Sequence, residues 1–528
     1  MRLVARGHEG AAAALPQVMA DFVARGELLG AMQAQVRRVG GCEQPIRMRG
    51  RVDLLDTVTG EVREAWSSQG QPDGTVLVAC GNRRASRCGP CSRLYQGDSY
   101  QLIVSGLSGG KGVPDSVTAH PALFVTLTAP AFGAVHSTRL GGRCHPRDGV
   151  CDHGRARGCF TVHDAQDPAL GQPVCADCFD YEAAVLWNAH AAELWRRTRI
   201  AITRHLARLR GVTERQVKAQ VRLSYVKVAE YQRRGLLHFH LAVRLDHAAP
   251  GHTQPPDGYT ADLLAAAITA AVASTEVPYP AARGAGQGHA CEAGSAGTLD
   301  APAPAHNEAT GPLGVPYPAQ ALPALDLHER PALRAARWGE QLDLSPIPTS
   351  DTLAEAAGVL SRGQVAGYLA KYATKHTEAL GAALDRRVRA EDLPTLAASS
   401  HVTRLVATAL LLASRYPRRT GGRPLNLDRW AHQLGYGGHW LTKSRRWSTT
   451  YTALRTARKE HQAARNPDPT DQPGEHEQRQ PSWQLADLGY RLQGDALLAQ
   501  HVRNDNSFAR EELRQLLHEE QITTALAA

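Results

Sequence analysis

The stretch that decides the fold runs from residue 225 to residue 240 and reads Tyr-Val-Lys-Val-Ala-Glu-Tyr-Gln-Arg-Arg-Gly-Leu-Leu-His-Phe-His. Residues 225–232 and 236–245 on its two sides are rich in strand-forming side chains. The break at residues 233–235 fits a three-residue hairpin loop in which Gly235 takes the left-handed third position. The sequence therefore predicts an antiparallel hairpin with a tight turn.

Counting back from this loop places Glu230 opposite His238. Side chains alternate between the two faces of a strand, so Glu230, His238 and His240 share one face and form a predicted metal site for Mg²⁺ or Mn²⁺. A two-residue loop would instead place Glu230 opposite Phe239 and remove it from the site. Two alternatives stay open: an ordinary hairpin with histidines on its polar face, and Gln232 in place of Glu230 as the third ligand.

The overall composition limits the class of protein. The chain has 528 residues, enough for about two to four domains. It carries 60 Lys+Arg against 51 Asp+Glu, a net charge of +9, which permits binding to nucleic acid. No apolar run reaches the roughly 18 residues of a membrane helix, and the N-terminus lacks the apolar core of a signal peptide. We therefore predict a cytoplasmic protein without membrane contact.

Ten cysteines are present, and most of them lie in two groups. Short spacings such as Cys88-x2-Cys91 and Cys175-x2-Cys178 are typical of zinc sites in a reducing compartment. We predict one or two structural Zn²⁺ ions, with ligands drawn from Cys80, Cys88, Cys91, Cys144, Cys151, His153, Cys159, Cys175 and Cys178. Cys42 and Cys291 stand alone in the sequence. The alternative is that these are free, buried cysteines.

Two tyrosines among lysines follow further along the chain. On a helix, Tyr368 and Tyr372 are four residues apart and share a face, while Lys371 and Lys375 occupy an adjacent one. A tyrosine attacks phosphorus once its proton is lost, and a nearby lysine or metal ion favours the ionised form. The alternative is a solvated basic helix with two interfacial tyrosines.

Three elements in order resemble the rolling-circle replication initiators of the HUH endonuclease class. Residues 124–128 (Phe-Val-Thr-Leu-Thr) are similar to the first strand motif of that class, and residues 238–240 to its His-hydrophobic-His metal motif. Residues 372–375 are similar to its tyrosine-x-x-lysine motif, which residues 368–371 also fit. Residues 370–375 (Ala-Lys-Tyr-Ala-Thr-Lys), together with the cysteine segments, resemble the corresponding sequences of initiators of actinobacterial plasmids and integrative elements. The tyrosines follow the histidines, an order that favours initiators over conjugative relaxases.

The resemblance implies a fold and a reaction. The fold is α+β: an HUH-type nuclease domain with a central antiparallel sheet flanked by helices, zinc-binding loop-rich inserts and a helical C-terminal region. The reaction is attack by tyrosine on origin DNA, presented as a single strand or hairpin, giving a 5′-phosphotyrosine and a free 3′-hydroxyl. Tyr372 is favoured because lysines flank it, and Tyr368 is a second nucleophile or a packing residue. A host helicase and polymerase are possible partners.

Composition and these motifs divide the chain into six parts. They are an unassigned, partly helical segment (1–75), zinc-binding segments with the first part of the nuclease domain (76–247), an Ala/Pro/Gly-rich and partly disordered insertion (248–345), the tyrosine helix (346–383), a basic helical DNA-binding region (384–458), and a linker followed by C-terminal helices (459–528).

Two basic groups are predicted to contact DNA. Arg83 and Arg84 flank the first cysteine group, and Lys443, Arg445 and Arg446 lie beside Trp440 and Trp447, a combination that suits phosphate contact with base stacking. A solvated charged face is the alternative. Two other functions remain open: a transposase of the same catalytic class, and a zinc-stabilised DNA-binding regulator without catalysis.

Overall fold

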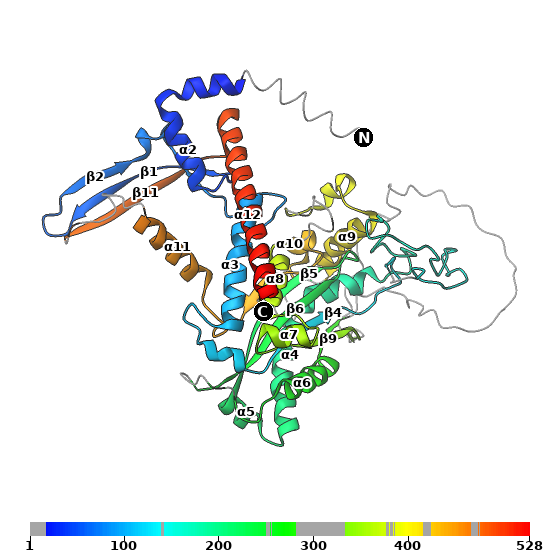
Figure 1. Cartoon of the computed structure of the whole chain (residues 1–528). Coiled ribbons are helices and arrows are strands. Elements are labelled where there is room, and N and C mark those ends of the chain that lie inside the picture. The colour runs from blue at the N-terminus through cyan, green and yellow to red at the C-terminus, as the bar shows by residue number, and fades with distance from the viewer. Residues whose placement is uncertain are drawn as a thin grey trace, which may run out of the picture. The chain divides into compact units, whose positions relative to one another are not determined.

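The computed structural model describes residues 17–138, 142–249, 254, 256–280, 333–375, 380, 384, 386–415, 424–465, 474 and 476–527 (Figure 1). The chain forms two compact units, one made of Met1–Leu102 with Thr450–Ala528 and the other of Ile103–Thr449. Cys291 and most of the predicted disorder in the 248–345 insertion lie outside the described residues. The six-part division made from the sequence stays a prediction.

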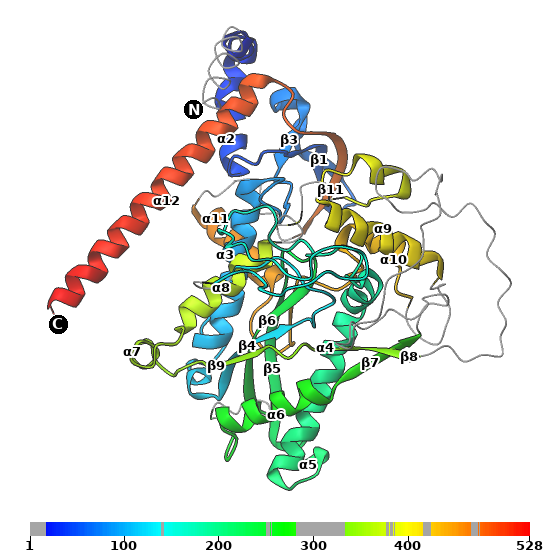
Figure 2. The same ribbon diagram turned by 90° about the vertical axis from the view of Figure 1, so that its right-hand side faces the viewer.

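The larger unit is built on a five-stranded antiparallel sheet in the order β10-β5-β6-β4-β9 (Figure 2). The strands are β4 (Ala122–Thr128), β5 (Val221–Tyr231), β6 (Leu237–His247), β9 (Leu342–Pro346) and β10 (Leu441–Lys443). The two edge strands, β9 and β10, begin only at residues 342 and 441, far along the chain from the end of β6 at residue 247, so only folding brings them to the sheet. The mixed α+β fold with an antiparallel sheet is as predicted.

The β5–β6 hairpin has the register predicted from its turn. Glu230 pairs with His238 and Val228 with His240. The backbone N–H of Gln232 donates to the Leu236 carbonyl at 2.9 Å. Gly235 adopts a φ of +73°, a left-handed conformation that favours glycine. On the neighbouring strand β4, Thr128 lies opposite His238 and Thr126 opposite His240.

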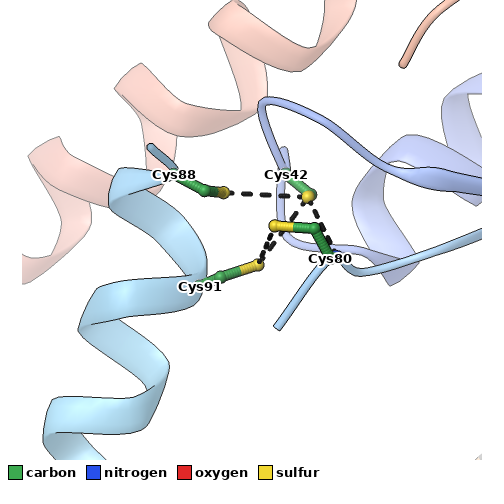
Figure 3. Close-up of side chains that lie close together, drawn as sticks. All are labelled: Cys42, Cys80, Cys88 and Cys91. Carbon is green, nitrogen blue, oxygen red and sulfur yellow. Dashed lines mark hydrogen bonds between the residues drawn. The ribbon is translucent and has the colours of Figure 1, made fainter. Parts of the chain in front are cut away.

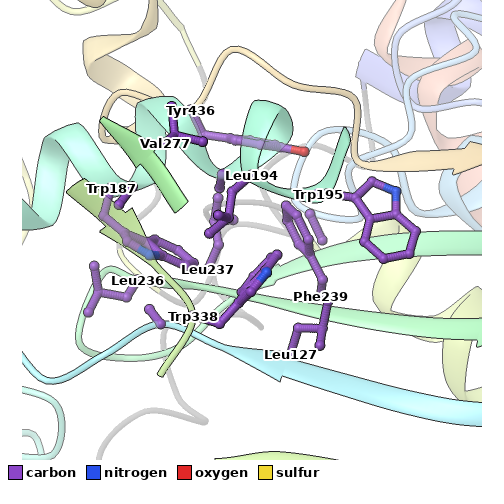
Figure 4. Close-up of a cluster of buried hydrophobic side chains, with 14 of the residues drawn as sticks. Leu127, Trp187, Leu194, Trp195, Leu236, Leu237, Phe239, Val277, Trp338 and Tyr436 are labelled. Carbon is purple, nitrogen blue, oxygen red and sulfur yellow. The ribbon is translucent and has the colours of Figure 1, made fainter. Parts of the chain in front are cut away.

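One face of this sheet carries the hydrophobic core. Helices α4 (Tyr181–Arg210) and α6 (Ala261–Ser274) cover it, and Phe239 and Leu127 of the sheet are buried with Trp187 of α4 (Figure 4). The Asp180 carboxylate accepts a hydrogen bond from the Ala183 amide where α4 begins, and a left-handed Gly211 ends it. These signals and the amphipathic pattern account for the bounds of α4.

The opposite face holds helix α8 (Arg362–Thr374) against β5 and β6. Ser361 and Gln364 form a capping box that starts the helix. Between the buried Arg362 and Thr374 at its two ends, its buried side is made of small or aliphatic residues, Val365, Ala366, Leu369, Ala370 and Ala373. Small side chains allow the helix to lie close to the sheet, and so bring its tyrosines onto the face that carries Glu230 and His240.

A charged network is buried on this same face, away from the histidines. The Arg244 guanidinium pairs with Asp246 (Nε to Oδ1, 2.6 Å) and also donates to the Gly106 carbonyl. The buried Trp447 ring lies over Arg244, at 5.0 Å from its Cζ atom. A Cβ atom added to Gly106 would lie 2.2 Å from Trp447 Nε1, so this close packing requires glycine.

The smaller unit contains a second sheet, in the order β11-β1-β2 with β3 also paired to β1. Its elements are α2 (Leu29–Arg38), β1 (Ile46–Asp56), β2 (Val62–Ser67), β3 (Val76–Val78), the first part of α3 (Gly89–Ser108), α11 (Tyr451–Arg465), β11 (Glu477–Leu488) and α12 (Gln493–Ala527). The buried Arg25 side chain pairs with Asp73 and with Asp495 and so ties the two ends of the chain together.

Strand β11 corrects the prediction of a linker followed only by helices. Its polar sequence around Pro481 has no apolar alternation that would indicate a strand. It becomes one because β1 pairs with it from Ile46↔Leu488 to Asp56↔Glu477. This long-range pairing cannot be read from the local sequence.

The remaining short elements connect these parts. They are η1 (Gly26–Leu28), η2 (Ser68–Gly70), η3 (Pro72–Gly74), η4 (Asp115–Ala119), α5 (Glu214–Gln220), β7 (Glu276–Pro280), β8 (Leu333–Arg337), α7 (Asp351–Ala356), η7 (Ala390–Thr395), α9 (Ser400–Arg415), α10 (Leu427–Trp430) and η8 (Ala431–Gln433). Among the helices described, none has both the length and the apolar character needed to cross a membrane.

Candidate nuclease site and metal-ligand sets

Strands β5 and β6 and helix α8 bring the predicted catalytic residues together. The Glu230 Oε2 atom lies 3.0 Å from His240 Nε2, and the Tyr368 hydroxyl lies 3.5 Å from the same nitrogen. The Tyr372 ring centroid is 5.5 Å from that of His240. Residues separated by more than a hundred positions therefore meet at one end of the sheet.

The two tyrosines differ in their surroundings. Their ring centroids are 4.5 Å apart. Lys375 Nζ lies 5.1 Å and Lys371 Nζ 5.8 Å from the centroid of the Tyr372 ring. Burial, with smaller contributions from Tyr372 and Glu230, raises the pKa of Tyr368 well above its ordinary value. Tyr372 thus lies nearer the lysines, and Tyr368 lies nearer His240 in an environment that opposes ionisation.

The histidines are held by different means. Thr126 Oγ1 lies 3.2 Å from His240 Nδ1, a contact that orients the ring and leaves Nε2 facing Glu230 and the Tyr368 hydroxyl. Burial, with smaller contributions from His240 and Arg234, lowers the pKa of His238 to about 3, so the ring is neutral at physiological pH. His238 Nε2 is buried, and no hydrogen-bond partner for it lies among the described residues.

This donor set fits a divalent metal ion. A buried imidazole nitrogen without a partner costs free energy, and a metal ion would satisfy it. Gln232, the alternative third ligand, has its Oε1 atom engaged by Arg234 Nε at 2.7 Å, which leaves Glu230 as the better candidate. Glu230, His238 and His240 are not among the described sets whose ligand atoms all lie within 4.8 Å of one another.

Three other sets of ligand atoms are already closed in the described part of the chain. Within each set all four atoms lie within 4.8 Å of one another. The sets are Cys42, Cys80, Cys88 and Cys91; His136, Cys144, Cys159 and His163; and Cys151, His153, Cys175 and Cys178. The described residues thus offer three ligand sets where the sequence predicted one or two zinc ions, and the number of ions bound stays a prediction.

The first set, in the smaller unit, consists of four sulfurs (Figure 3). Cys42 Sγ lies 3.7 Å from both Cys88 Sγ and Cys91 Sγ, and Cys80 Sγ lies 3.6 Å from Cys91 Sγ. Four sulfurs bound to one Zn²⁺ at about 2.3 Å would lie about 3.8 Å apart, so the spacing fits a tetrahedral ion. The interpretation of Cys42 as an isolated cysteine is wrong.

The second and third sets divide the middle cysteines in a way that the spacing did not reveal. Cys159 Sγ lies 3.4 Å from His163 Nε2, and Asp167 orients that ring through a 2.6 Å contact with Nδ1. In the third set, Cys178 Sγ lies 3.4 Å from His153 Nδ1. The sequence prediction missed His136 and His163 because neither lies in a paired motif.

The predicted DNA-contacting residues are only partly placed as expected. Arg445 and Arg446 are exposed, whereas Lys443 is half-buried and donates to the Ser448 carbonyl at 3.0 Å. Trp440 and Trp447 are 6% and 0% exposed, so the prediction that they stack on bases is wrong. Both pack in the protein interior, and their polar neighbours made them resemble surface residues in the sequence.

The first predicted DNA-contacting pair lies in the smaller unit. Arg83 is exposed, and its guanidinium lies over the Tyr95 ring, 5.2 Å from the centroid. Arg84 is half-buried in the same loop beside the four-cysteine set. Contact of Arg83 and Arg84 with phosphate stays a prediction.

Comparison with known proteins identifies the family. Residues 28–296 and 294–504 match the family model described as "Replication initiator protein, pSAM2". The chain belongs to this family of replication initiators. A replication initiator protein from Streptomyces ambofaciens is 34% identical over 537 residues, an alignment that covers 97% of this chain and 100% of the relative. No solved structure matches this initiator. The predicted kinship to replication initiators is confirmed at the level of the family.

Proposed function

We propose that this initiator starts replication by cutting and rejoining one strand of origin DNA through covalent catalysis of the HUH type. The observation that carries the proposal is the meeting of Tyr368 and Tyr372 with His240 and Glu230 on one face of the sheet. A nucleophile beside a set of metal ligands is what phosphodiester transesterification requires. The replication initiator family supports origin DNA as the substrate.

In this mechanism the tyrosine oxygen attacks the scissile phosphorus. The new bond joins tyrosine to the 5′-phosphate, the bond to the 3′-oxygen breaks, and the phenol proton is balanced by the proton gained by the 3′-hydroxyl. The reverse reaction later joins the ends. A divalent ion held by Glu230, His238 and His240 would supply Lewis-acid polarisation of the phosphate.

We assign the first attack to Tyr372. Lys375 and Lys371 lie near its ring, and a positive charge stabilises the phenolate. Tyr368 is more difficult to ionise because burial raises its pKa. Tyr368 is then the second nucleophile, which acts when Tyr372 already carries DNA.

The other predicted sites complete the proposal. The three closed ligand sets bind structural Zn²⁺, which stabilises the segments that carry the ligands. The exposed Arg83, Arg445 and Arg446 contact phosphates, together with Arg84 and Lys443 where their side chains reach DNA. The free 3′-hydroxyl would be extended by a host polymerase behind a host helicase.

The test is formation of a covalent protein–DNA adduct. Labelled single strands that tile the origin of the host element are incubated with the protein and Mn²⁺ or Mg²⁺, and adducts are separated on a denaturing gel. We expect an adduct that Tyr372→Phe and His238→Ala abolish, while Tyr100→Phe, a tyrosine outside the site, leaves it intact. If no strand gives an adduct, a non-catalytic DNA-binding role replaces this proposal; cuts at element ends alone would indicate a transposase.

A further inference from the structure

A cavity of about 340 Å³ lies against the turn of the β5–β6 hairpin. Its walls are the turn itself (residues 232–234), the segment 135–138, and residues 165, 170 and 171 of the loop that carries the second cysteine–histidine set. The volume falls within the range of sites for small ligands. The nuclease mechanism described above does not use it.

The loop wall is joined to the turn by direct contacts. A Cβ atom added to Gly171 would lie 2.5 Å from the carbonyl carbon of Arg233, so only glycine permits this approach. The Arg233 guanidinium donates to the Ala165 carbonyl at 2.9 Å. The Gly171 amide donates to the His136 carbonyl at 2.8 Å, which closes the wall on the other side. The cavity is therefore shaped before any ligand enters.

The turn wall is equally fixed. The Arg234 guanidinium donates to the carbonyls of Ala129 (2.9 Å) and Pro130 (3.1 Å), where strand β4 ends, and to Gln232 Oε1 (2.7 Å). Because its oxygen is engaged, the Gln232 amide offers its Nε2 hydrogens to a ligand. A fixed donor of this kind selects a hydrogen-bond acceptor in the cavity.

The cavity also lies close to the proposed site of cutting. Gln232 follows Glu230 by two residues, a separation of about 7 Å along an extended chain. Because side chains alternate between the two sides of such a chain, those of Glu230 and Gln232 point to the same side. His238 lies on the strand that leaves the same turn. A DNA strand held at the histidines can therefore reach the cavity with a nucleotide adjacent to the cut.

We propose that this cavity binds one unpaired nucleotide of the DNA strand next to the scissile phosphate; the inference rests on the proposed function. Val135 and Leu170 offer apolar surface to the faces of a base. Gln232 donates to an acceptor on the base edge, and the exposed Arg233 contacts a phosphate. A base that is stacked and paired in a duplex has no free face or edge to offer these groups, so the cavity selects single-stranded DNA.

The first experiment fills the cavity. Ala165→Trp places a large side chain in it, and Gln166→Trp is the matched control at an exposed neighbour that does not line it. Both are made in the Tyr368→Phe/Tyr372→Phe protein, so that only reversible binding is measured. The probes are a fluorescent single strand of thymidines, about 15 nucleotides long, and a duplex of equal length, followed by anisotropy.

We expect Ala165→Trp to weaken binding of the single strand at least about tenfold, with duplex binding and the control unchanged. Equal affinity of both variants for the single strand would overturn the proposal. A second measurement does not depend on folding of a variant: a strand containing 4-thiothymidine is cross-linked to the unsubstituted protein by light. Cross-links in residues 135–138 or 232–234 support the cavity, and cross-links confined to other residues contradict it.

The adduct assay separates this inference from the proposed function. If Ala165→Trp loses single-strand binding while no adduct ever forms in the protein with both tyrosines, the cavity stands and the nuclease proposal fails. If adducts form and Ala165→Trp binds and reacts as well as the control, the nuclease stands and the cavity proposal fails.

Discussion

The proposed nuclease face, formed by Glu230, His238 and His240, and the three closed ligand sets differ in how they place candidate metal ligands. On the nuclease face, the strand register of β5 and β6 directs Glu230, His238 and His240 to one side, but their ligand atoms do not form a closed set. In the three closed ligand sets, most of whose members lie outside helices and strands, the ligand atoms lie within 4.8 Å of one another. The strands keep their direction through backbone hydrogen bonds and a buried core, whereas the ligands of the closed sets lie mostly on segments outside helices and strands. The loops should therefore depend on metal for folding, and the nuclease face should depend on it only for chemistry.

The largest expected effect is loss of a cysteine ligand. Cys88→Ala in the four-sulfur set removes a tetrahedral ligand, and a structural zinc site contributes on the order of 10 kcal/mol to folding. We expect loss of one bound Zn²⁺ and loss of the cooperative unfolding of the smaller unit, measured by metal analysis and calorimetry. Ser86→Ala in the same loop is the control and should retain both. Full metal content in Cys88→Ala would show that this set does not bind zinc.

Loss of a ligand on the proposed nuclease face should affect the reaction and leave the stability of the fold nearly unchanged. His240→Ala removes a nitrogen that lies near both Glu230 and Tyr368, and we expect adduct formation to fall by at least about a hundredfold. The melting temperature should change by no more than about 5 °C, since the sheet is held by its core. A large loss of stability would contradict the difference between the two regions.

A third effect concerns the sheet behind the histidines. Lys227 is 3% exposed, with its Nζ atom 3.8 Å from the centroid of the Phe239 ring and 3.3 Å from the Tyr436 hydroxyl. Burial lowers the pKa of Lys227 to about 7. The unfolded chain, with a lysine pKa of about 10.4, binds more protons between these values, so this group makes stability rise with pH from about 7 to 10.

Lys227→Met should remove the free-energy cost of keeping a protonated lysine buried. We expect the variant to be more stable by about 3 kcal/mol at pH 7, with the gain shrinking toward pH 10, in denaturant titrations followed by tryptophan fluorescence. Lys218→Met, at an exposed lysine of α5, is the control and should show neither effect. A gain that stays constant with pH would show that Lys227 is not the titrating group.

The smallest expected effect tests whether a side chain of the neighbouring strand β4 orients His240. Thr126→Val keeps the shape of the side chain but removes the contact with His240 Nδ1 at 3.2 Å. Contacts of this kind change metal affinity or activity by about tenfold, and we expect a loss of that size in adduct formation. The loss should be partly restored by raising the Mn²⁺ concentration. No loss at any metal concentration would mean that the sheet alone orients His240.

Local sequence signals predicted part of the nuclease face well. Gly235 and the alternation on either side of it determined the hairpin register, because the conformation of a tight turn fixes which residues pair across it. The start and the end of helix α4 are likewise encoded by residues next to it, Asp180 and Gly211. Strand β11 was missed because its partner lies more than four hundred residues away in the sequence.

The sequence by itself determined the turn, the face shared by Glu230, His238 and His240, and the spacing of the two tyrosines on a helix, all of which depend on neighbours in the chain. Only the tertiary structure decided that the tyrosine helix lies against this hairpin, that Cys42 joins Cys80, Cys88 and Cys91, and that Trp440 and Trp447 are buried. These outcomes depend on packing between distant segments, which the burial of apolar surface and the geometry of ligand atoms decide together.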